Sequence, residues 1–181
     1  MTLSTEDAAL FYKLWLPLLD YVNRKYKVNK KLRRMAEAKS LDPEEVKKVA
    51  DRLWDNVEVI DDYLSEQTEM PEEHKKIISG WKRCVRGRFI MERHLKKGTI
   101  FISMENEEVY QVSGIVSSWE EMFCGAPLPI ILEAAMIPFQ DVIISDGLVM
   151  PYNIIIGRTM AGELKDVYLN AKKAGKIHRT L

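Results

Sequence analysis

The pattern of apolar residues changes near residue 83, and this change constrains the fold more than any other feature of the sequence. Before it, apolar residues recur every three or four positions, which is typical of one face of an α-helix. After Val85, β-branched and aromatic residues come in short runs separated by glycine, asparagine and proline, as in strands joined by turns. Helices followed by strands predict an α+β fold.

Four or five helices are expected in residues 1–82, which we interpret as a helical lobe. Asp42 followed by Pro43 is typical of a helix start, because the carboxylate caps free backbone N–H groups and proline suits the first turn. A short helix is expected before it, at Lys30–Lys39. Asp55-Asn56 is a point at which the next helical pattern can divide into two helices.

Residues 83–181 are expected to form an antiparallel curved sheet or small barrel of five or six strands. Asp146-Gly147 predicts a tight type I′ hairpin turn, which needs residues that tolerate positive φ. A closing helix is expected at Gly162–Lys173, and the helical lobe is expected to pack on the sheet as one compact unit. The expected strands are Val85–His94, Thr99–Met104, Glu108–Ile115, Leu132–Phe139, Val142–Ser145 and Leu148–Tyr152.

Charge and cysteine content limit the partners and the compartment. The chain carries 27 basic and 27 acidic residues, so no overall field attracts nucleic acid or an anionic membrane. Two cysteines without close spacing are typical of a reducing compartment. The N-terminal stretch has acids where a secretion signal has basic residues. We therefore expect a cytoplasmic protein without a membrane segment.

A local basic segment offers candidate anion or nucleic-acid contacts. We interpret Lys82–Lys97 as the most basic stretch, with Arg86, Arg88 and Arg93 as the candidates. Strand alternation predicts that Arg86 and Arg88 point outward, and that Arg93 shares the inward parity near a strand end. The zero net charge favours the alternative of solvated strand arginines opposite acids such as Glu105.

A second candidate anion contact is Arg158, beside two glycines with the spacing found in phosphate-binding P-loops. Gly157 and Gly162 follow an apolar run and precede an expected helix. Glu163 and Leu164 stand where the P-loop needs lysine and serine or threonine. The alternative, a glycine turn into a helix, explains the same residues and is the interpretation that we favour.

Three acids form a candidate set for acid–base chemistry. Glu133, Asp141 and Asp146 lie on or between neighbouring expected strands, so folding can bring them together. The alternative is structural, because a turn explains Asp146 and a strand connection explains Asp141.

No metal site and no cofactor are predicted. His74, His94 and His178 lie far apart in the sequence, and none has the short spacing to another ligand that a zinc site on a helix or knuckle shows.

The run Ala134–Gly157 resembles a segment of a family of uncharacterised bacterial proteins, some of which carry a C-terminal zinc-binding SEC-C motif. The resemblance implies a bacterial, cytoplasmic protein and attaches no activity to a named residue. Zinc binding is not carried over, because this sequence has no cysteine-rich tail. The residues that carry the resemblance are Ile137-Pro138-Phe139, Ile143, Asp146-Gly147-Leu148 and Tyr152.

No complete catalytic or cofactor motif accompanies the predicted fold, so we interpret the chain as a non-enzymatic module that binds a protein or peptide. The alternative is a small enzyme or nucleic-acid-processing protein that uses the acids of residues 133–146 and the arginine face. The apolar run Ile154–Ile156 fits an interior strand or a dimer edge, which leaves homo-oligomerisation open.

Overall fold

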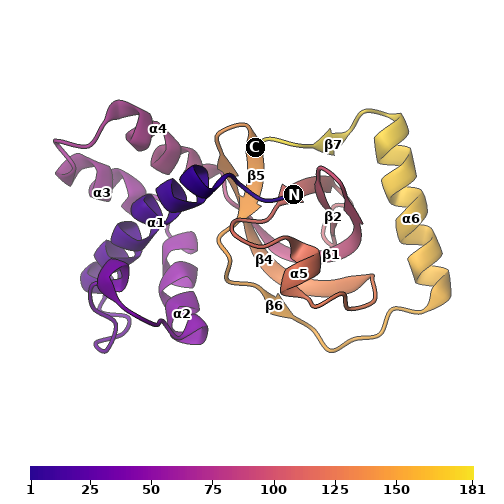
Figure 1. Ribbon diagram of the computed structural model, residues 1–181, viewed down its shortest axis with the longest axis horizontal. Coiled ribbons are helices and arrows are strands. Elements are labelled where there is room, and N and C mark those ends of the chain that lie inside the picture. Colours follow the sequence, from indigo (N-terminus) through magenta and orange to yellow (C-terminus); the bar gives the residue numbers. More distant parts are fainter. The chain divides into compact units, whose positions relative to one another are not determined.

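A computed structural model describes every residue from Met1 to Leu181. Its contacts divide the chain into a helical unit, Thr5–Cys84, and a strand unit, Met1–Ser4 with Val85–Leu181. The predicted α+β class is confirmed, because four α-helices precede a mostly antiparallel sheet and a C-terminal helix (Figure 1). No helix combines the length and the apolar character that crossing a bilayer requires.

The helical unit is built around its first helix, which contacts the three other α-helices. Its core is aromatic: the ring of Trp15 stacks on Trp54 at 5.4 Å and meets Trp81 edge-on at 5.6 Å. These three tryptophans are all buried. The elements are α1 (Thr5–Tyr26), the short 3₁₀ helix η1 (Met35–Glu37), α2 (Pro43–Trp54), α3 (Val59–Glu66), α4 (Glu72–Gly80) and the 3₁₀ helix η2 (Trp81–Arg83).

The predicted helix starts are confirmed where the caps are strong. The carboxylate of Asp42 accepts the N–H of Glu44 at 3.0 Å, and α2 and α3 divide near Asp55-Asn56 as expected. The helix predicted at Lys30–Lys39 is wrong, because η1 is the only helical turn there. Side chains of α1 hold the backbone of this segment in other geometry, as described below.

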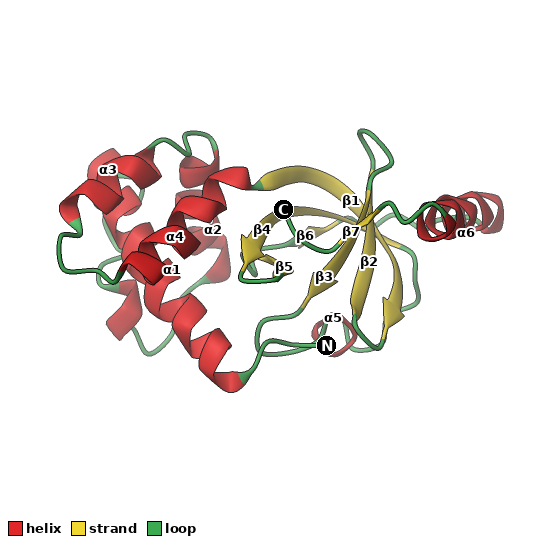
Figure 2. Ribbon diagram, turned by 90° about the horizontal axis from the view of Figure 1, so that it is seen from above, coloured by secondary structure: helices red, strands yellow, loops and turns green.

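The strand unit contains a near-closed ring of five strands in the order β1-β2-β3-β5-β4, with β4 pairing back onto β1. All of these pairs are antiparallel except β3–β5. Figure 2 shows the ring strands in yellow. The strands are β1 (Val85–Leu95), β2 (Gly98–Ser103), β3 (Val109–Ser113), β4 (Ile130–Phe139), β5 (Val142–Ser145), β6 (Met150–Pro151) and β7 (Ile177–His178), and the helices are α5 (Trp119–Met122) and α6 (Arg158–Lys173).

The prediction that all neighbouring strands are antiparallel is wrong at β3 and β5, where Val112 pairs in parallel with Ile143. The predicted hairpin at Asp146-Gly147 is also wrong, because β5 and β6 both pair with β4. β5 and β6 therefore run in the same direction beside β4, and the chain breaks the strand between them at Asp146-Gly147. Gly147 has φ of 81°, whereas Asp146 does not adopt positive φ, so the type I′ geometry is absent.

A five-stranded Greek-key ring in this order, with a helix between the third and fourth strands, has the connectivity of OB-fold barrels. In such barrels, the outer face of the second and third strands commonly binds oligonucleotides or oligosaccharides. Here that face is covered, because Ile100 and Ile102 of β2 pack in one cluster with Leu164 and Tyr168 of α6. Both views show α6 beside the ring (Figures 1 and 2).

Candidate functional site

The predicted arginine face on β1 is occupied by an ion pair. Arg88 lies opposite Glu133 in the β1–β4 register, and Arg86 Nη2 lies 3.8 Å from Glu133 Oε1. The structural alternative therefore applies to Arg86, whose ion-pair partner is an acid of β4, while Arg88 is exposed and lies opposite the same acid in the strand register. The pair also places Glu133, a candidate acid, beside a positive charge.

Arg93 does not have the inward parity that the sequence predicted. The β1–β2 register shifts between Met91 and Arg93, so one extra residue reverses the alternation. The Arg93 guanidinium lies 4.2 Å from the ring centroid of Tyr168 on α6, and its Nη2 donates to Glu92 at 2.7 Å. Hydrogen bonding to Glu92 raises the pKa of Arg93. This arginine fastens α6 to β1.

Of the remaining predicted residues, Arg158 and Asp141 are exposed and belong to other segments, whereas the backbone N–H of Asp146 donates to the Ala135 carbonyl, which lies opposite Arg86 in the strand register. Arg158 is exposed at the start of α6, and Gly162 lies inside that helix, so the P-loop alternative has no phosphate-binding loop. Asp141 is exposed in the β4–β5 turn, roughly 20 Å along β4 from Glu133 at 3.3 Å per residue. Asp146 is buried, and its carboxylate accepts the N–H of Leu148 at 3.0 Å.

No three histidine, cysteine or acidic side chains gather in a way that can hold a metal ion. His94 Nδ1 lies 2.9 Å from Thr99 Oγ1, and burial lowers the pKa of His94. His178 stacks on Tyr110 at 5.0 Å, while the Tyr110 hydroxyl donates to Glu108 at 2.6 Å. These contacts attach the C-terminal strand β7 to β3.

The most basic stretch of the chain lies elsewhere, and the interpretation of Lys82–Lys97 as that stretch is wrong. Residues 24–34, here named the basic loop, hold seven lysines and arginines among eleven residues and no acid. A count of charges in a short sliding window identifies the segment from sequence alone. All seven side chains belong to exposed residues: Arg24, Lys25, Lys27, Lys30, Lys31, Arg33 and Arg34.

Most of these charges lack an acidic partner. Lys25 Nζ pairs with Asp62 at 2.6 Å, and Arg34 Nη1 pairs with Glu37 at 3.3 Å. Both pairs are at least partly exposed to solvent, where such contacts contribute little stability. The other five cations form no ion pair: Arg24, Lys27, Lys30, Lys31 and Arg33.

A buried amide on α1 holds the basic loop in place. Asn23 is only 5% exposed, and its Nδ2 donates to the carbonyls of Asn29 at 2.9 Å and Leu32 at 2.7 Å. Its Oδ1 accepts the N–H of Asn29 at 2.8 Å. These bonds replace the backbone pairing of a helix, which explains why the predicted helix does not form. The three hydrogen bonds of this one side chain therefore fix the backbone path of the loop.

A carboxylate fixes the end of the loop. Both oxygens of Asp20 accept the N–H of Met35, at 2.9 and 3.1 Å, directly after Arg34 with its left-handed φ of 53°. Asp20, Asn23 and Arg24 lie on one face of α1 because residues three and four positions apart are neighbours on a helix. The last turns of α1 thus supply both the supports of the loop and two of its cations, Arg24 and Lys25.

A cavity of about 660 Å³ opens where the basic loop, α1 and the end of α3 meet. Three arginines line it: Arg24, Arg33 and Arg34. Tyr63 and Gln67 form part of the opposite lining. Burial raises the pKa of Tyr63, so its phenol stays neutral at physiological pH.

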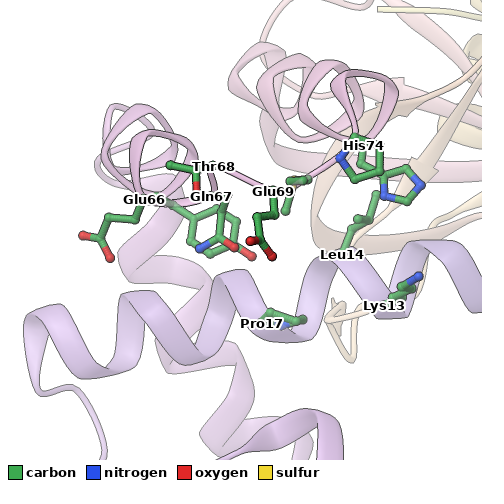
Figure 3. Close-up of a pocket in the computed structure, with 11 residues that line it drawn as sticks. Lys13, Leu14, Pro17, Glu66, Gln67, Thr68, Glu69 and His74 are labelled. Atoms are coloured by element: carbon green, nitrogen blue, oxygen red, sulfur yellow. The ribbon is translucent and has the colours of Figure 1, made fainter.

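A second cavity of about 460 Å³ lies further along α1 and shares Pro17, Tyr63 and Gln67 with the first. Figure 3 shows Gln67 and Glu69 turned toward α1 near Pro17. Proline has no N–H to donate, so α1 loses one helical hydrogen bond at this point. The two cavities lie next to each other along α1 in the helical unit and share these three lining residues.

Comparisons of this chain with protein-family models, with curated proteins and with solved structures find no match. The resemblance to the bacterial family stays a prediction.

Proposed function

We propose that this protein binds single-stranded nucleic acid and contacts the phosphate backbone through the basic loop. One observation carries the proposal: seven cations occupy residues 24–34 without an acid, and five of them have no ion-pair partner. Clusters of this density commonly contact phosphates, since each contact releases a condensed counterion. The zero net charge of the chain makes such a patch a local feature.

The hydrogen bonds that hold the loop support the same function. Asn23 and Asp20 form hydrogen bonds with the backbone of the loop and of the residue that follows it, so less conformational freedom is lost when a ligand binds. The ring connectivity adds an argument by analogy only, because OB-fold barrels often bind oligonucleotides. In this chain α6 covers the corresponding strand face, so the basic loop and not that face is the proposed contact surface.

Salt dependence tests this proposal. We expect the affinity for a single-stranded oligouridylate of about ten nucleotides to fall with salt, with a logarithmic slope of about −3.5 if five cations each contact a phosphate. Fluorescence anisotropy at several salt concentrations measures the slope. A protein that binds vesicles of anionic lipid but not the oligonucleotide contradicts the proposal, and so does one with no salt-sensitive binding.

A second candidate function, binding to another protein, is favoured by one specific observation. The segment between β6 and α6 exposes Ile154 and Ile155, and the side chain of Ile155 is 95% exposed. Met150 and Met160 are exposed on either side of it. Adjacent exposed apolar side chains are typical of an interaction site.

The partner that we test is a second copy of the same chain, because self-association can be measured with the purified protein alone. If the segment mediates self-association, we expect light scattering to give a dimer mass that falls to the monomer mass in the Ile154→Ser/Ile155→Ser variant. A matched control is Met104→Ser, which changes an exposed apolar residue of the β2–β3 connection. A monomer mass for the unmodified protein at all concentrations contradicts self-association through this segment.

A further inference from the structure

The cavity beside the basic loop has the size and lining of a site for one nucleotide. Its volume of about 660 Å³ lies within the range of roughly 300 to 1,000 Å³ that is common for small-molecule sites. A phosphate ion alone fills only a small part of such a space. A ligand that uses the whole cavity therefore has an organic body as well as an anionic group.

One wall of the cavity is cationic. Arg24 and Arg33 form no ion pair, and Arg34 has only the exposed contact with Glu37. The single acid of the lining, Asp20, directs both oxygens to the N–H of Met35. Three guanidinium groups and one carboxylate leave two net positive charges, which match the charge of close to −2 on a terminal phosphate monoester at neutral pH.

The rest of the lining is mainly apolar and aromatic. Leu32, Pro17 and the neutral ring of Tyr63 belong to it, and the amide of Gln67 offers one acceptor and two donors. A nucleobase has the matching chemistry, with a flat apolar body and hydrogen-bonding edges. Guanidinium groups bind phosphate with two parallel hydrogen bonds, so the phosphate belongs at the arginine wall.

The charge of the neighbouring cavity limits which part of a nucleic-acid strand can occupy the nucleotide site. Glu66 and Glu69 line it together with a single lysine, Lys13 (Figure 3). This negative surplus repels a second phosphate beyond the nucleotide site. A strand can therefore place an end in the cavity, with its remaining phosphates leaving across the basic loop.

We propose that the cavity of Arg24, Arg33 and Arg34 binds a nucleoside 5′-phosphate, as the 5′ end of a strand or as a free mononucleotide. Binding of the 5′ end of a strand rests on the proposed function, because it requires that the basic loop binds the rest of that strand. The phosphate lies at the arginines, and the base lies toward Tyr63 and Gln67.

The test compares oligouridylates of about ten nucleotides that carry a 5′-phosphate or a 5′-hydroxyl. We expect the 5′-phosphorylated strand to bind about tenfold more tightly, because charge-assisted bidentate contacts are added at one end. Uridine 5′-monophosphate is expected to reduce this preference by competition, whereas inorganic phosphate at the same concentration is not. Isothermal titration calorimetry measures each affinity.

A matched pair of variants locates the site. Arg24→Gln is expected to abolish the preference for the 5′-phosphate, while Arg83→Gln, an exposed arginine of the same unit outside this cavity, is expected to retain it. Circular dichroism checks that both variants are folded. The Gln67→Leu variant provides a second test, since it keeps the charge but should weaken binding of uridine 5′-monophosphate.

The outcomes separate the two proposals. Equal affinity for the two strands together with no binding of uridine 5′-monophosphate, while salt-sensitive strand binding is retained, overturns the nucleotide site and leaves strand binding in place. Binding of uridine 5′-monophosphate that Arg24→Gln removes, without binding of any strand, supports the nucleotide site and contradicts the proposed function. Inorganic phosphate that binds as tightly as the mononucleotide also overturns the nucleotide site.

Discussion

A variant with Lys30→Gln, Lys31→Gln and Arg33→Gln is expected to bind single-stranded oligouridylate more than tenfold more weakly at low salt. The logarithmic salt slope should become about two units shallower, because about 0.7 is lost for each of three phosphate contacts. Fluorescence anisotropy over a range of salt concentrations measures both quantities. The three residues are exposed in the basic loop, so the fold should be retained.

The matched control removes the same number of charges from the strand unit. Lys165→Gln, Lys173→Gln and Lys176→Gln alter three exposed lysines on α6 and just after it. This control changes the net charge equally, so it should keep the affinity within about twofold and the slope unchanged if binding is local. Equal losses in the two triple variants mean that the basic loop is not the contact surface.

The Asn23→Ala variant is expected to lower the free energy of unfolding of the helical unit by about 3 kcal/mol. It removes three hydrogen bonds and leaves partly buried backbone groups of Asn29 and Leu32 without their partner, at about 1 to 3 kcal/mol for each unsatisfied group. Urea unfolding followed by tryptophan fluorescence reports mainly on this unit, which contains Trp15, Trp54 and Trp81.

The control for this variant is Asn56→Ala, which removes an exposed amide in the same unit. Asn56 makes one side-chain bond, to the Tyr26 hydroxyl at 2.8 Å, so a loss of about 0.5 kcal/mol is expected. Asn23→Ala should also weaken oligonucleotide binding although no charge changes, because the loop is no longer held. Similar losses of stability in both variants contradict the role of Asn23 as the support of the loop.

Some features of the predicted arginines depend on strand register and could not be predicted from the sequence. Alternation along β1 identified Arg86 and Arg88 as outward residues, yet the ion pair of Arg86 with Glu133 depends on the β1–β4 register. The inward parity expected for Arg93 failed because one extra residue in a bulge reverses the alternation. A bulge has no clear signal in the amino-acid composition, so the direction of this side chain could be determined only from the observed strand register.

The basic loop is the opposite case, because its charge is visible in the sequence while its geometry is not. Counting charges over residues 24–34 finds the segment, and helix periodicity then predicts a helix over part of it. The structure replaces that helix with a loop, since Asn23 and Asp20 bind its backbone. No local signal shows that these two side chains turn toward the loop.

The sequence by itself determined the class and order of the elements. Caps such as Asp42-Pro43 start helices through local hydrogen bonds and backbone geometry, and short β-branched runs mark most of the strands. These signals act within a few residues, so they survive without tertiary contacts. Long-range pairing has no such local signal.

Only the tertiary structure decided which strands pair and which surfaces remain open. The parallel β3–β5 pair closes the ring, and Asp146-Gly147 interrupts a strand where the sequence predicted a hairpin. In the same way, α6 covers β2 while the cavity beside Arg24 stays open. Segments distant in the chain meet in each case, so the choice depends on burying apolar area and satisfying hydrogen bonds across the whole unit.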